Sequence, residues 1–359
     1  MLYYLAEFLK PYFGPARLLQ SHVLLLAGAT FSAALLVYLL LPRLWNRLPR
    51  DRGKMLCADV GGAKSAGKPT GTGLIVTLLC LPVVLFFMPL DFWDGVALAG
   101  IYFAMLFGYL DDRAVVPWGE LKKGLLDAVC ALVIALAIAK GHSTLVWLPF
   151  VKGMWTMPLA VYVPAVAFIL WFTMNATNCS DGVDGLAGTL TEIALVMLAV
   201  MLYVVVGYKP VAHYLLLPCN PAAARWAILT MAVAGGFGGY LWYNAEPSKI
   251  LMGDAGSRFL GILVGAGAAV AGNPLLVLAF APIVLVNGGG GLGKLVLLRL
   301  AKKVGFQIGD DALIRRIRFP LHDHCKKNLG WSNAQVLMRF TLLQLVVMPL
   351  LLLLLLKVR

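Results

Sequence analysis

Long apolar runs recur from one end of this 359-residue chain to the other, and they restrict its fold more than any other feature. The mean hydropathy is +0.85, far above that of a water-soluble domain. A helix needs about 20 mostly apolar residues to cross a bilayer, so the chain is predicted to be a polytopic membrane protein. The runs lack the two-residue alternation of membrane β-barrels. We therefore expect an all-α bundle, built as a single domain over residues 1–359.

About ten transmembrane helices are predicted, at residues 23–41, 74–90, 96–110, 125–139, 161–174, 186–206, 227–242, 259–271, 275–301 and 336–356. The ninth contains Asn-Gly-Gly-Gly-Gly at 287–291. This run predicts a broken helix, and such breaks are tolerated at membrane depth only against protein or a watery cavity. Before the fifth span, the segment 141–159 holds two β-prone runs around Val-Lys-Gly-Met, which allow a short β-hairpin.

The basic residues of the chain are concentrated in two loops. Lysine and arginine total 30 against 17 acidic residues, a net charge of +13. They crowd the segments 43–68 and 299–327, and the positive-inside rule places both in the cytoplasm. Counting spans from there puts both termini and the hairpin outside, with cytoplasmic loops near 43–73, 111–124, 175–185, 243–257 and 302–331. Topology and contacts with anionic lipid account for most of the charge, so no nucleic-acid partner is expected.

Two adjacent carboxylates, Asp111 and Asp112, end the third predicted span. The helix dipole disfavours negative charge at a C-terminus, and neighbouring like charges repel each other. A bound cation or a proton is the natural partner of such a pair. The alternative is a solvated pair in a loop.

Three further aspartates, Asp181, Asp184 and Asp254, are each predicted to open a helix. Aspartate is a good N-cap, and plain capping is the alternative reading. Glycines flank these residues in Ser-Asp-Gly-Val-Asp-Gly and in Met-Gly-Asp-Ala-Gly-Ser, where backbone N–H groups at a helix start would attract phosphate. Acids beside phosphate make sense when a divalent metal bridges the two groups.

The histidines His322 and His324 stand on either side of Asp323. Zinc would need a third ligand that is not obvious, so hydrogen bonds to phosphate or sugar suit the pair better. The six cysteines show no Cys-x-x-Cys spacing, which argues against a disulfide framework or a thiolate metal site. A phosphate-loop-like run begins at Gly62, but Pro69 stands where a hydroxyl would bind magnesium.

Five motifs in a fixed order give the chain a resemblance to a known family. They are Lys-x-x-Gly-x-Pro-Thr (64–70), Asp-Asp (111–112), Asn-Ala-x-Asn-x-x-Asp-Gly-x-Asp-Gly-Leu-Ala (175–187), Met-Gly-Asp-x-Gly-Ser (252–257), and Pro-x-His-x-His followed by Gly-Trp (320–331). Together they span nearly the whole chain. The sequence resembles the bacterial phospho-N-acetylmuramoyl-pentapeptide transferases, a family of the polyprenyl-phosphate N-acetylhexosamine-1-phosphate transferase superfamily.

The resemblance implies a Mg²⁺-dependent reaction of peptidoglycan synthesis. Undecaprenyl phosphate would attack UDP-MurNAc-pentapeptide, giving lipid I and UMP, at the cytoplasmic face of the bacterial inner membrane. The partners implied are these two substrates and membrane lipid, and a homodimer is one arrangement that the sequence leaves open. Because a phosphate monoester is largely a dianion at neutral pH, we expect direct attack, although the sequence does not exclude an aspartate acting as base or nucleophile.

The family pattern also assigns roles to residues of this chain. Asp254 would hold Mg²⁺, with Asp111 as a further candidate ligand, and Asp111 and Asp112 would act on the lipid phosphate. His322 and His324 would face the phosphate or sugar as catalytic residues. Substrate binding would involve Lys64, Thr70, Lys122, Lys123, Asn175, Asn178, Asp181, Asp184, Asn244, Leu251 and Gly253.

Two alternatives remain at this point. Asp323 stands in place of the family's middle histidine and Leu251 in place of a customary aromatic residue, which keeps a UDP-GlcNAc-using transferase of the same superfamily open. The broken ninth helix would also suit a secondary transporter. Transport sites lie near the membrane midplane, whereas the acids here are expected at helix ends, with no buried acid mid-span. That expectation argues against a transporter.

Overall fold

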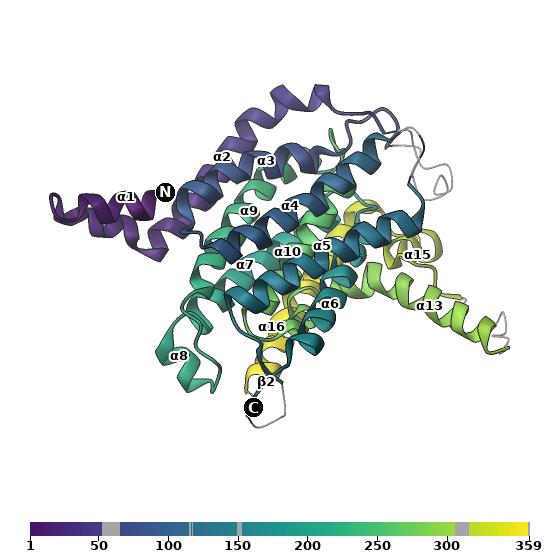
Figure 1. Ribbon diagram of the computed structural model, residues 1–359. Helices are drawn as coiled ribbons and strands as arrows, with labels where there is room; N and C mark the ends of the chain where they lie inside the picture. The colour runs from purple at the N-terminus through teal and green to yellow at the C-terminus, as the bar shows by residue number, and fades with distance from the viewer. Residues whose placement is uncertain (52–64, 115, 117, 149–152, 306–315, 358–359) are drawn as a thin grey trace.

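The computed structural model describes residues 1–51, 65–114, 116, 118–148, 153–305 and 316–357. Within them the chain is a helical bundle (Figure 1). Its first half contains α1 (Leu2–Leu9), α2 (His22–Leu44), α3 (Thr72–Phe87), α4 (Phe92–Arg113), α5 (Glu120–Gly141), α6 (Leu159–Ser180) and α7 (Leu186–Val200). Its second half contains α8 (Lys209–Tyr214), α9 (Ala223–Asn244), α10 (Gly253–Val270), α11 (Val277–Phe280), α12 (Pro282–Val284), α13 (Gly290–Lys303), α15 (Leu321–Asn328) and α16 (Asn333–Lys357).

The structure confirms a helical membrane architecture, but it does not confirm ten spans. Among the described residues, seven helices are long and apolar enough to cross a membrane: His22–Arg47, Phe92–Arg113, Glu120–Gly141, Leu159–Ser180, Leu186–Val205, Pro282–Lys303 and Asn333–Leu356. The other predicted spans correspond to α3, which has only 16 residues, and to α9 and α10. These last two are rich in glycine and alanine, which add little hydropathy.

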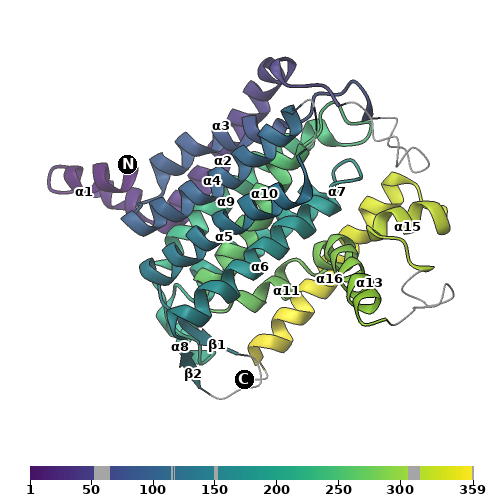
Figure 2. The same cartoon turned by 45° about the vertical axis from the view of Figure 1, so that its right-hand side comes forward.

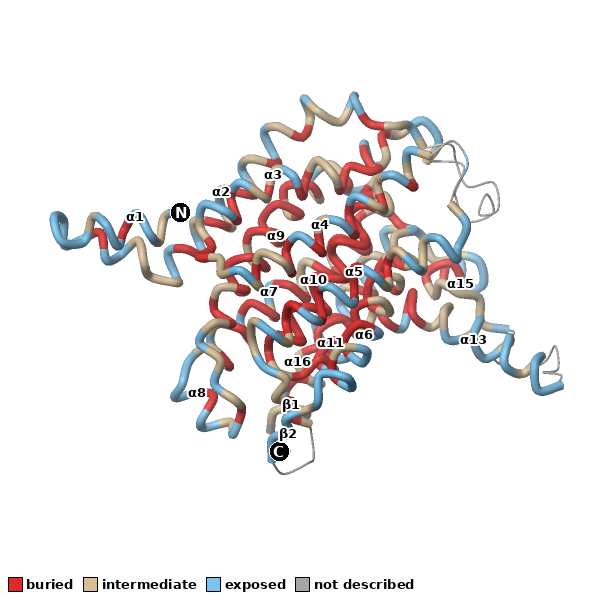
Figure 3. The backbone as a smooth tube through the Cα atoms, viewed as in Figure 1, coloured by how far each residue is buried: buried red, intermediate tan, exposed pale blue. Residues whose placement is uncertain are grey.

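Helix α10 lies at the centre of the bundle, where every residue from Ala255 to Val270 is buried. Figure 3 shows the buried backbone concentrated there. Glycines allow neighbouring helices to approach its first turn closely: a Cβ on Gly73 of α3 would lie 2.2 Å from the Cα of Gly256. A Cβ on Gly108 of α4 would lie 2.6 Å from the carbonyl oxygen of Asp254. The start of α10 is therefore fixed by direct backbone contact with α3 and α4.

The predicted β-hairpin is present. Strands β1 (Leu145–Trp147) and β2 (Met154–Thr156) pair antiparallel, with Leu145 opposite Thr156 and Trp147 opposite Met154. Figures 1 and 2 place it, with α1, α8 and both chain termini, at the end of the bundle opposite α15. The loops expected inside and those expected outside thus lie at opposite ends.

The ninth predicted span is interrupted, but not where the glycine run predicted. The helix breaks at Ala281, whose φ and ψ are −127° and 44°. The stretch Leu285–Gly289 is instead a continuous π-helical turn that leads into α13. Its glycines serve close packing, since a Cβ on Gly288 would lie 1.9 Å from the carbonyl oxygen of Ala176 on α6. Beyond this turn α13 extends away from the bundle (Figures 1 and 2).

Candidate functional site

The predicted site residues lie where several helices begin or end at one end of the bundle. Asp111 and Asp112 occupy the last turn of α4, as the sequence predicted, and Asp254 lies in the first turn of α10. Asp112 accepts a hydrogen bond from the backbone N–H of Ala255 at 3.3 Å. Both Asp111 and Asp254 lie close enough for their charges to act on Asp112. Three carboxylates from two helices therefore share one small region.

Glycine is required where α10 starts beside this group. Gly253 has a φ of +72°, in the left-handed region that disfavours side chains. A Cβ there would also lie 2.4 Å from Oδ2 of Asp112 and 2.7 Å from the backbone nitrogen of Gly71. Gly253 consequently shapes the site through its backbone.

The segment that leads into α3 is hydrogen-bonded to the segment that leads into α10. The backbone nitrogen of Leu251 donates to the Pro69 carbonyl at 2.8 Å, and the Thr72 hydroxyl donates to the Leu251 carbonyl at 2.7 Å. Thr70 lies within this pairing, and its N–H donates to the Pro49 carbonyl at 2.9 Å. Thr70 and Leu251 are thus neighbours, while Lys64 lies outside the described residues.

The first carboxylate of the pair has a basic partner. Lys123, in the first turn of α5, forms an ion pair with Oδ2 of Asp111, and the backbone N–H of Trp118 donates to Oδ1 at 2.9 Å. The neighbouring Lys122 places its Nζ 3.7 Å from the centre of the Trp118 ring, a cation–π contact. The connection between α4 and α5 therefore folds over Asp111 and brings two lysines to the site.

The structure adds two charged residues that sequence reasoning missed, Asp127 and Arg258. Both are almost fully buried, with 0% and 3% of their surface exposed. Arg258 Nη1 lies 2.5 Å from Asp127 Oδ1, and Nη2 lies 3.4 Å from Asp254 Oδ2. An aspartate within the otherwise apolar span 125–139 was a signal that could have been read, because such residues are costly in a membrane unless paired.

The loop between α6 and α7 corrects one expectation. Asp181 and Asp184 were predicted to open a helix, but Asp181 is the C-cap of α6, and the N-cap of α7 is Gly185. Asp184 instead accepts from the backbone N–H of Ser248 at 3.1 Å and lies 3.5 Å from Lys68 Nζ. Neither acid is the N-cap of α7, so N-capping does not explain them.

Three asparagines near this loop are engaged in hydrogen bonds. Asn244 accepts from the Gly185 N–H at 2.8 Å and donates to the Ile250 carbonyl at 2.7 Å. The Asn178 side chain accepts from the Ser257 hydroxyl at 3.0 Å. Asn175 donates to the carbonyl oxygen one turn earlier in α6 at 2.8 Å. Asn244 therefore ties the α6–α7 loop to the segment that precedes α10.

The two histidines lie on helix α15, close to the same loop. His322 is buried, and both its backbone N–H and its Nδ1 contact Asn287 Oδ1, at 2.9 and 3.1 Å. Its ring also touches Gly182, where a Cβ would lie 2.2 Å from Nε2. His324 accepts from the backbone N–H of Arg318 at 3.3 Å. The π-helical turn that carries Asn287 thus joins α15 to the α6–α7 loop.

An apolar groove borders the π-helical turn that carries Asn287. Its lining includes Phe172 of α6, Leu285 of the π-helical turn, Phe319, and Val347 and Leu351 of α16. Because the same π-helical turn borders the groove and carries Asn287, the groove leads towards the polar end of the bundle. A hydrocarbon chain would fit such a lining.

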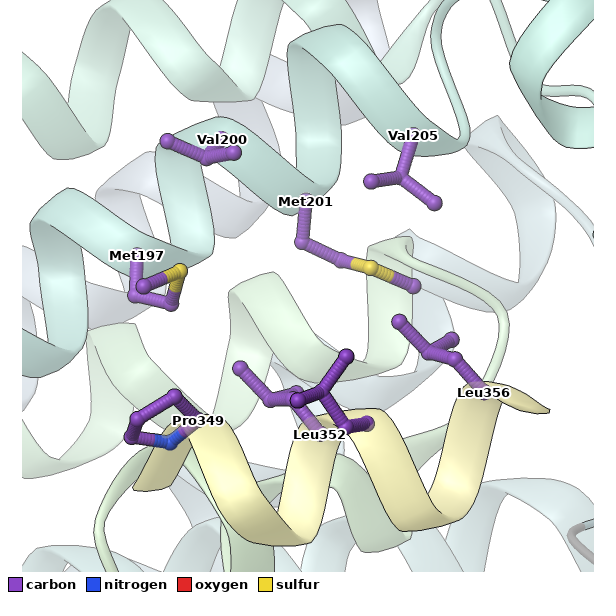
Figure 4. Close-up of a pocket in the computed structure, with 8 residues that line it drawn as sticks. Met197, Val200, Met201, Val205, Pro349, Leu352 and Leu356 are labelled. Atoms are coloured by element: carbon purple, nitrogen blue, oxygen red, sulfur yellow. The ribbon is translucent and has the colours of Figure 1, made fainter. Parts of the chain in front are cut away.

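Another apolar pocket lies between α7 and α16 (Figure 4). Met197, Val200 and Met201 line one side, and Pro349 and Leu352 line the other. All the residues that line it are apolar, so it offers packing for hydrocarbon but no side chain for phosphate chemistry.

The protein carboxylates do not enclose a metal by themselves. Within the described residues, no group of three or more histidine, cysteine, aspartate or glutamate side chains is arranged to hold a metal ion. Mg²⁺ commonly uses only one or two protein carboxylates and completes its shell with water and substrate phosphates. The neighbouring charges of Asp112 and Asp254 suit that mode of binding.

Comparisons with known proteins identify the family of the chain. Residues 95–272 match the family described as Glycosyl transferase family 4. A phospho-N-acetylmuramoyl-pentapeptide-transferase of Treponema pallidum (strain Nichols) is 42% identical over 346 residues, covering 94% of this chain and 91% of that protein. Proteins of the same name from Borreliella afzelii (strain PKo) and Koribacter versatilis (strain Ellin345) are 28% and 29% identical, covering 92% and 96% of this chain and 95% and 97% of their own lengths. The chain therefore belongs to the phospho-N-acetylmuramoyl-pentapeptide-transferase family.

Proposed function

We propose that this protein transfers phospho-MurNAc-pentapeptide from UDP-MurNAc-pentapeptide to undecaprenyl phosphate, giving lipid I and UMP. The observation that carries the proposal is 42% identity to a transferase of that name over 94% of the chain. The arrangement of carboxylates at helix ends, beside an apolar groove, supports it. A water-soluble nucleotide sugar and a lipid phosphate would both reach such a site.

The acceptor lipid is proposed to lie in the groove between α6, the interrupted ninth segment and α16. Its apolar lining suits a polyprenyl tail, and because Phe319 lines it just before α15, the phosphate is proposed to lie near His322. Since His322 is buried against Asn287, its ring is held in place before substrate arrives. His322 would then stand at the boundary between the tail and the phosphates.

Asp254, with Asp112 beside it, is proposed to hold Mg²⁺, and Asp111 is a further candidate ligand. Two ionised carboxylates that lie close together repel each other, which disfavours ionisation of both. A divalent cation bound between them would remove that repulsion. When bound, Mg²⁺ would neutralise charge on the diphosphate of the donor. Lys123 compensates Asp111, whereas Arg258, which contacts Asp254, is itself compensated by Asp127, so Asp112 and Asp254 are the stronger candidates.

The chain's own residues would mainly bind and orient the reactants. The lipid phosphate is largely a dianion at neutral pH, with a second pKa of about 6, so it can attack phosphorus without a protein base. Lys122 and Lys123 offer positive charge to phosphate oxygens, while the Ala255 N–H in the first turn of α10 holds Asp112 in place. Bringing two phosphates into line in a site of this kind accounts for much of the barrier reduction in phosphoryl transfer.

The donor nucleotide is proposed to lie along the α6–α7 loop. Asn175, Asn178, Asp181 and Asp184 remain the proposed contacts with uridine, together with the segment Thr70 to Gly71 and Leu251. Asn244 would act by shaping this loop, because both ends of its amide are bonded to backbone. Leu251 contributes its backbone to that wall.

The proposed setting is the bacterial cytoplasmic membrane, with the site on the cytoplasmic side and both termini outside. The two basic loops support this orientation by the positive-inside rule. Both termini lie at the end of the bundle away from α15, which agrees with it (Figure 1).

The test is UMP release by the purified protein in detergent, with undecaprenyl phosphate and Mg²⁺. We expect release with UDP-MurNAc-pentapeptide and not with UDP-GlcNAc, and we expect Asp112→Asn to lose at least about a hundredfold in turnover. Glu7→Gln, an exposed change on α1 at the opposite end, is the control and should keep wild-type turnover. Release with UDP-GlcNAc alone would assign the protein to the sister activity, and release with neither would refute both.

A further inference from the structure

The ion pair between Arg258 and Asp127 joins α10 to α5 next to Asp254, the proposed metal ligand. Arg258 lies one helical turn after Asp254, and its guanidinium contacts carboxylates on two helices. Nη1 lies 2.5 Å from Asp127 Oδ1, and Nη2 lies 3.4 Å from Asp254 Oδ2. The side chains of Arg258 and Asp127 are 4% and 0% exposed, whereas that of Asp254 is 24% exposed. The inner carboxylate is thus fully enclosed, and the outer one faces the site.

The geometry gives the two carboxylates different tasks. A guanidinium is planar, so fixing one of its edges fixes the direction of the other. Asp127 holds the Nη1 edge inside the bundle, and Nη2 is consequently directed at one oxygen of Asp254. The other oxygen of Asp254 is left for a ligand in the site.

The pair is not arranged for stability alone. Asn175 is a further hydrogen-bond partner of Asp127, but Arg258 Nε is buried without a hydrogen-bond partner within the described part of the chain. Buried ion pairs with unsatisfied groups often stabilise a fold no better than apolar side chains of similar size. An arginine kept in such a place is better explained by what it does to Asp254.

We propose that Arg258, anchored by Asp127, is a positioning residue that fixes the orientation of the Asp254 carboxylate. The proposal rests on the function proposed above, in which Asp254 holds the divalent cation. Arg258 acts through Asp254 and touches neither substrate. Orientation of a ligand by a buried partner commonly changes metal affinity or activity by about 10- to 100-fold.

The decisive variant is the double change Asp127→Asn with Arg258→Met. It removes one negative and one positive charge together, so the net charge near Asp254 stays the same and no buried ion is left unpaired. Methionine keeps much of the length of the arginine stem. We therefore expect the metal-free double variant to retain most of the wild-type melting temperature, while each single variant melts lower.

The first readout is Mn²⁺ binding to the purified protein without substrates, followed by the electron paramagnetic resonance signal of free Mn²⁺. We expect the double variant to bind Mn²⁺ about tenfold more weakly than the wild type. Asp254→Asn should lose this binding, which shows that the titration reports on the proposed site. Wild-type affinity in the double variant would overturn the proposal.

The second readout is turnover with saturating Mg²⁺ and substrates. A positioning role predicts that kcat falls about tenfold in the double variant while the KM for the nucleotide sugar stays within about twofold. Arg258→Lys should also have a lower kcat than the wild type, since an ammonium lacks the planar fork that contacts both carboxylates. If the double variant kept both the kcat and the melting temperature of the wild type, the pair of Arg258 and Asp127 would serve packing alone. If the wild type released no UMP, the proposed function would fail, while the Mn²⁺ titration would still decide the role of the pair.

Discussion

The end of the bundle opposite the candidate site is held by a buried network around Asp94, and replacing this residue tests its contribution to stability. Asp94 is 2% exposed and lies in the first turn of α4. Its Oδ1 accepts from Trp226 Nε1 at 2.8 Å and lies 3.1 Å from His142 Nε2, while Oδ2 lies 3.0 Å from Arg225 Nη2. Arg225 also contacts Asp91 at 2.6 Å. Asp94 therefore links α4, α9 and the residue after α5.

The change Asp94→Asn keeps the shape of the side chain but removes its charge. The new amide would present either an N–H to the Arg225 guanidinium or an N–H to the Trp226 indole, so one buried donor faces another donor. Breaking a buried ion pair from one side costs about 3–5 kcal/mol, and we expect roughly 3 kcal/mol here because Arg225 keeps Asp91. At roughly 2–3 °C per kcal/mol for a large domain, the melting temperature should fall by about 5–10 °C.

The assay is thermal unfolding in one detergent at a fixed scan rate, because membrane proteins often unfold irreversibly. Asp91→Asn is the matched control: the Asp91 side chain is 39% exposed, and an exposed pair contributes about 1 kcal/mol or less. Both variants should keep wild-type turnover at a temperature where they are folded, since the network around Asp94 lies at the opposite end of the bundle from the candidate site. Equal melting temperatures for the two variants would refute the reasoning, and loss of turnover in a stable Asp94→Asn protein would show that this end takes part in the reaction.

Two further changes probe the site itself. Gly73→Ala would place a Cβ 2.2 Å from the Gly256 backbone, so α3 must move away from α10. Both the melting temperature and the turnover should therefore fall by clear margins. Gly119→Ala is the control: a Cβ there meets nothing within 4 Å, and both readouts should stay at wild-type values. Trp118→Ala removes the cation–π contact with Lys122, which is worth about 0.5–1 kcal/mol at an exposed site. It should raise the KM for the nucleotide sugar by no more than about fivefold in steady-state assays; a collapse of kcat instead would place the indole in the reaction itself.

The grouping of polar residues was predictable because it depends on where apolar runs end. Hydropathy locates helix ends, and positive charge locates one side of the membrane, so Asp112 and Asp254 were expected at the same end. The hairpin was also predictable, since β-prone runs on either side of a turn need only local pairing. Lys123 was anticipated near the phosphates, but its ion pair with Asp111 follows from the fold of the α4–α5 connection.

The sequence misled where the outcome depended on contacts between distant helices. A glycine run suggested a broken helix at 287–291, yet Gly288 and Gly289 pack against α6, and the break occurs at Ala281. Two acids within the predicted spans were overlooked: Asp127 is buried near the start of the span 125–139, and Glu192 is partly buried in the span 186–206. One sequence does not reveal that Arg258 lies across from Asp127, so this ionic contact could not be predicted.

These two acids bear on the transporter alternative, because the absence of a buried acid mid-span had counted against it. The contacts supply a better criterion. Asp127 is paired with Arg258, which also contacts Asp254 in the first turn of α10, so this acid belongs to the group at the helix ends and not to a separate site at the membrane midplane. Glu192 lies on α7, where a Cβ on Gly238 of α9 would approach its Oε1 to 2.9 Å. A single acid between two helices offers few ligands to a transported metal ion, whereas Asp111, Asp112 and Asp254 are grouped at helix ends, where the proposed function has its phosphates.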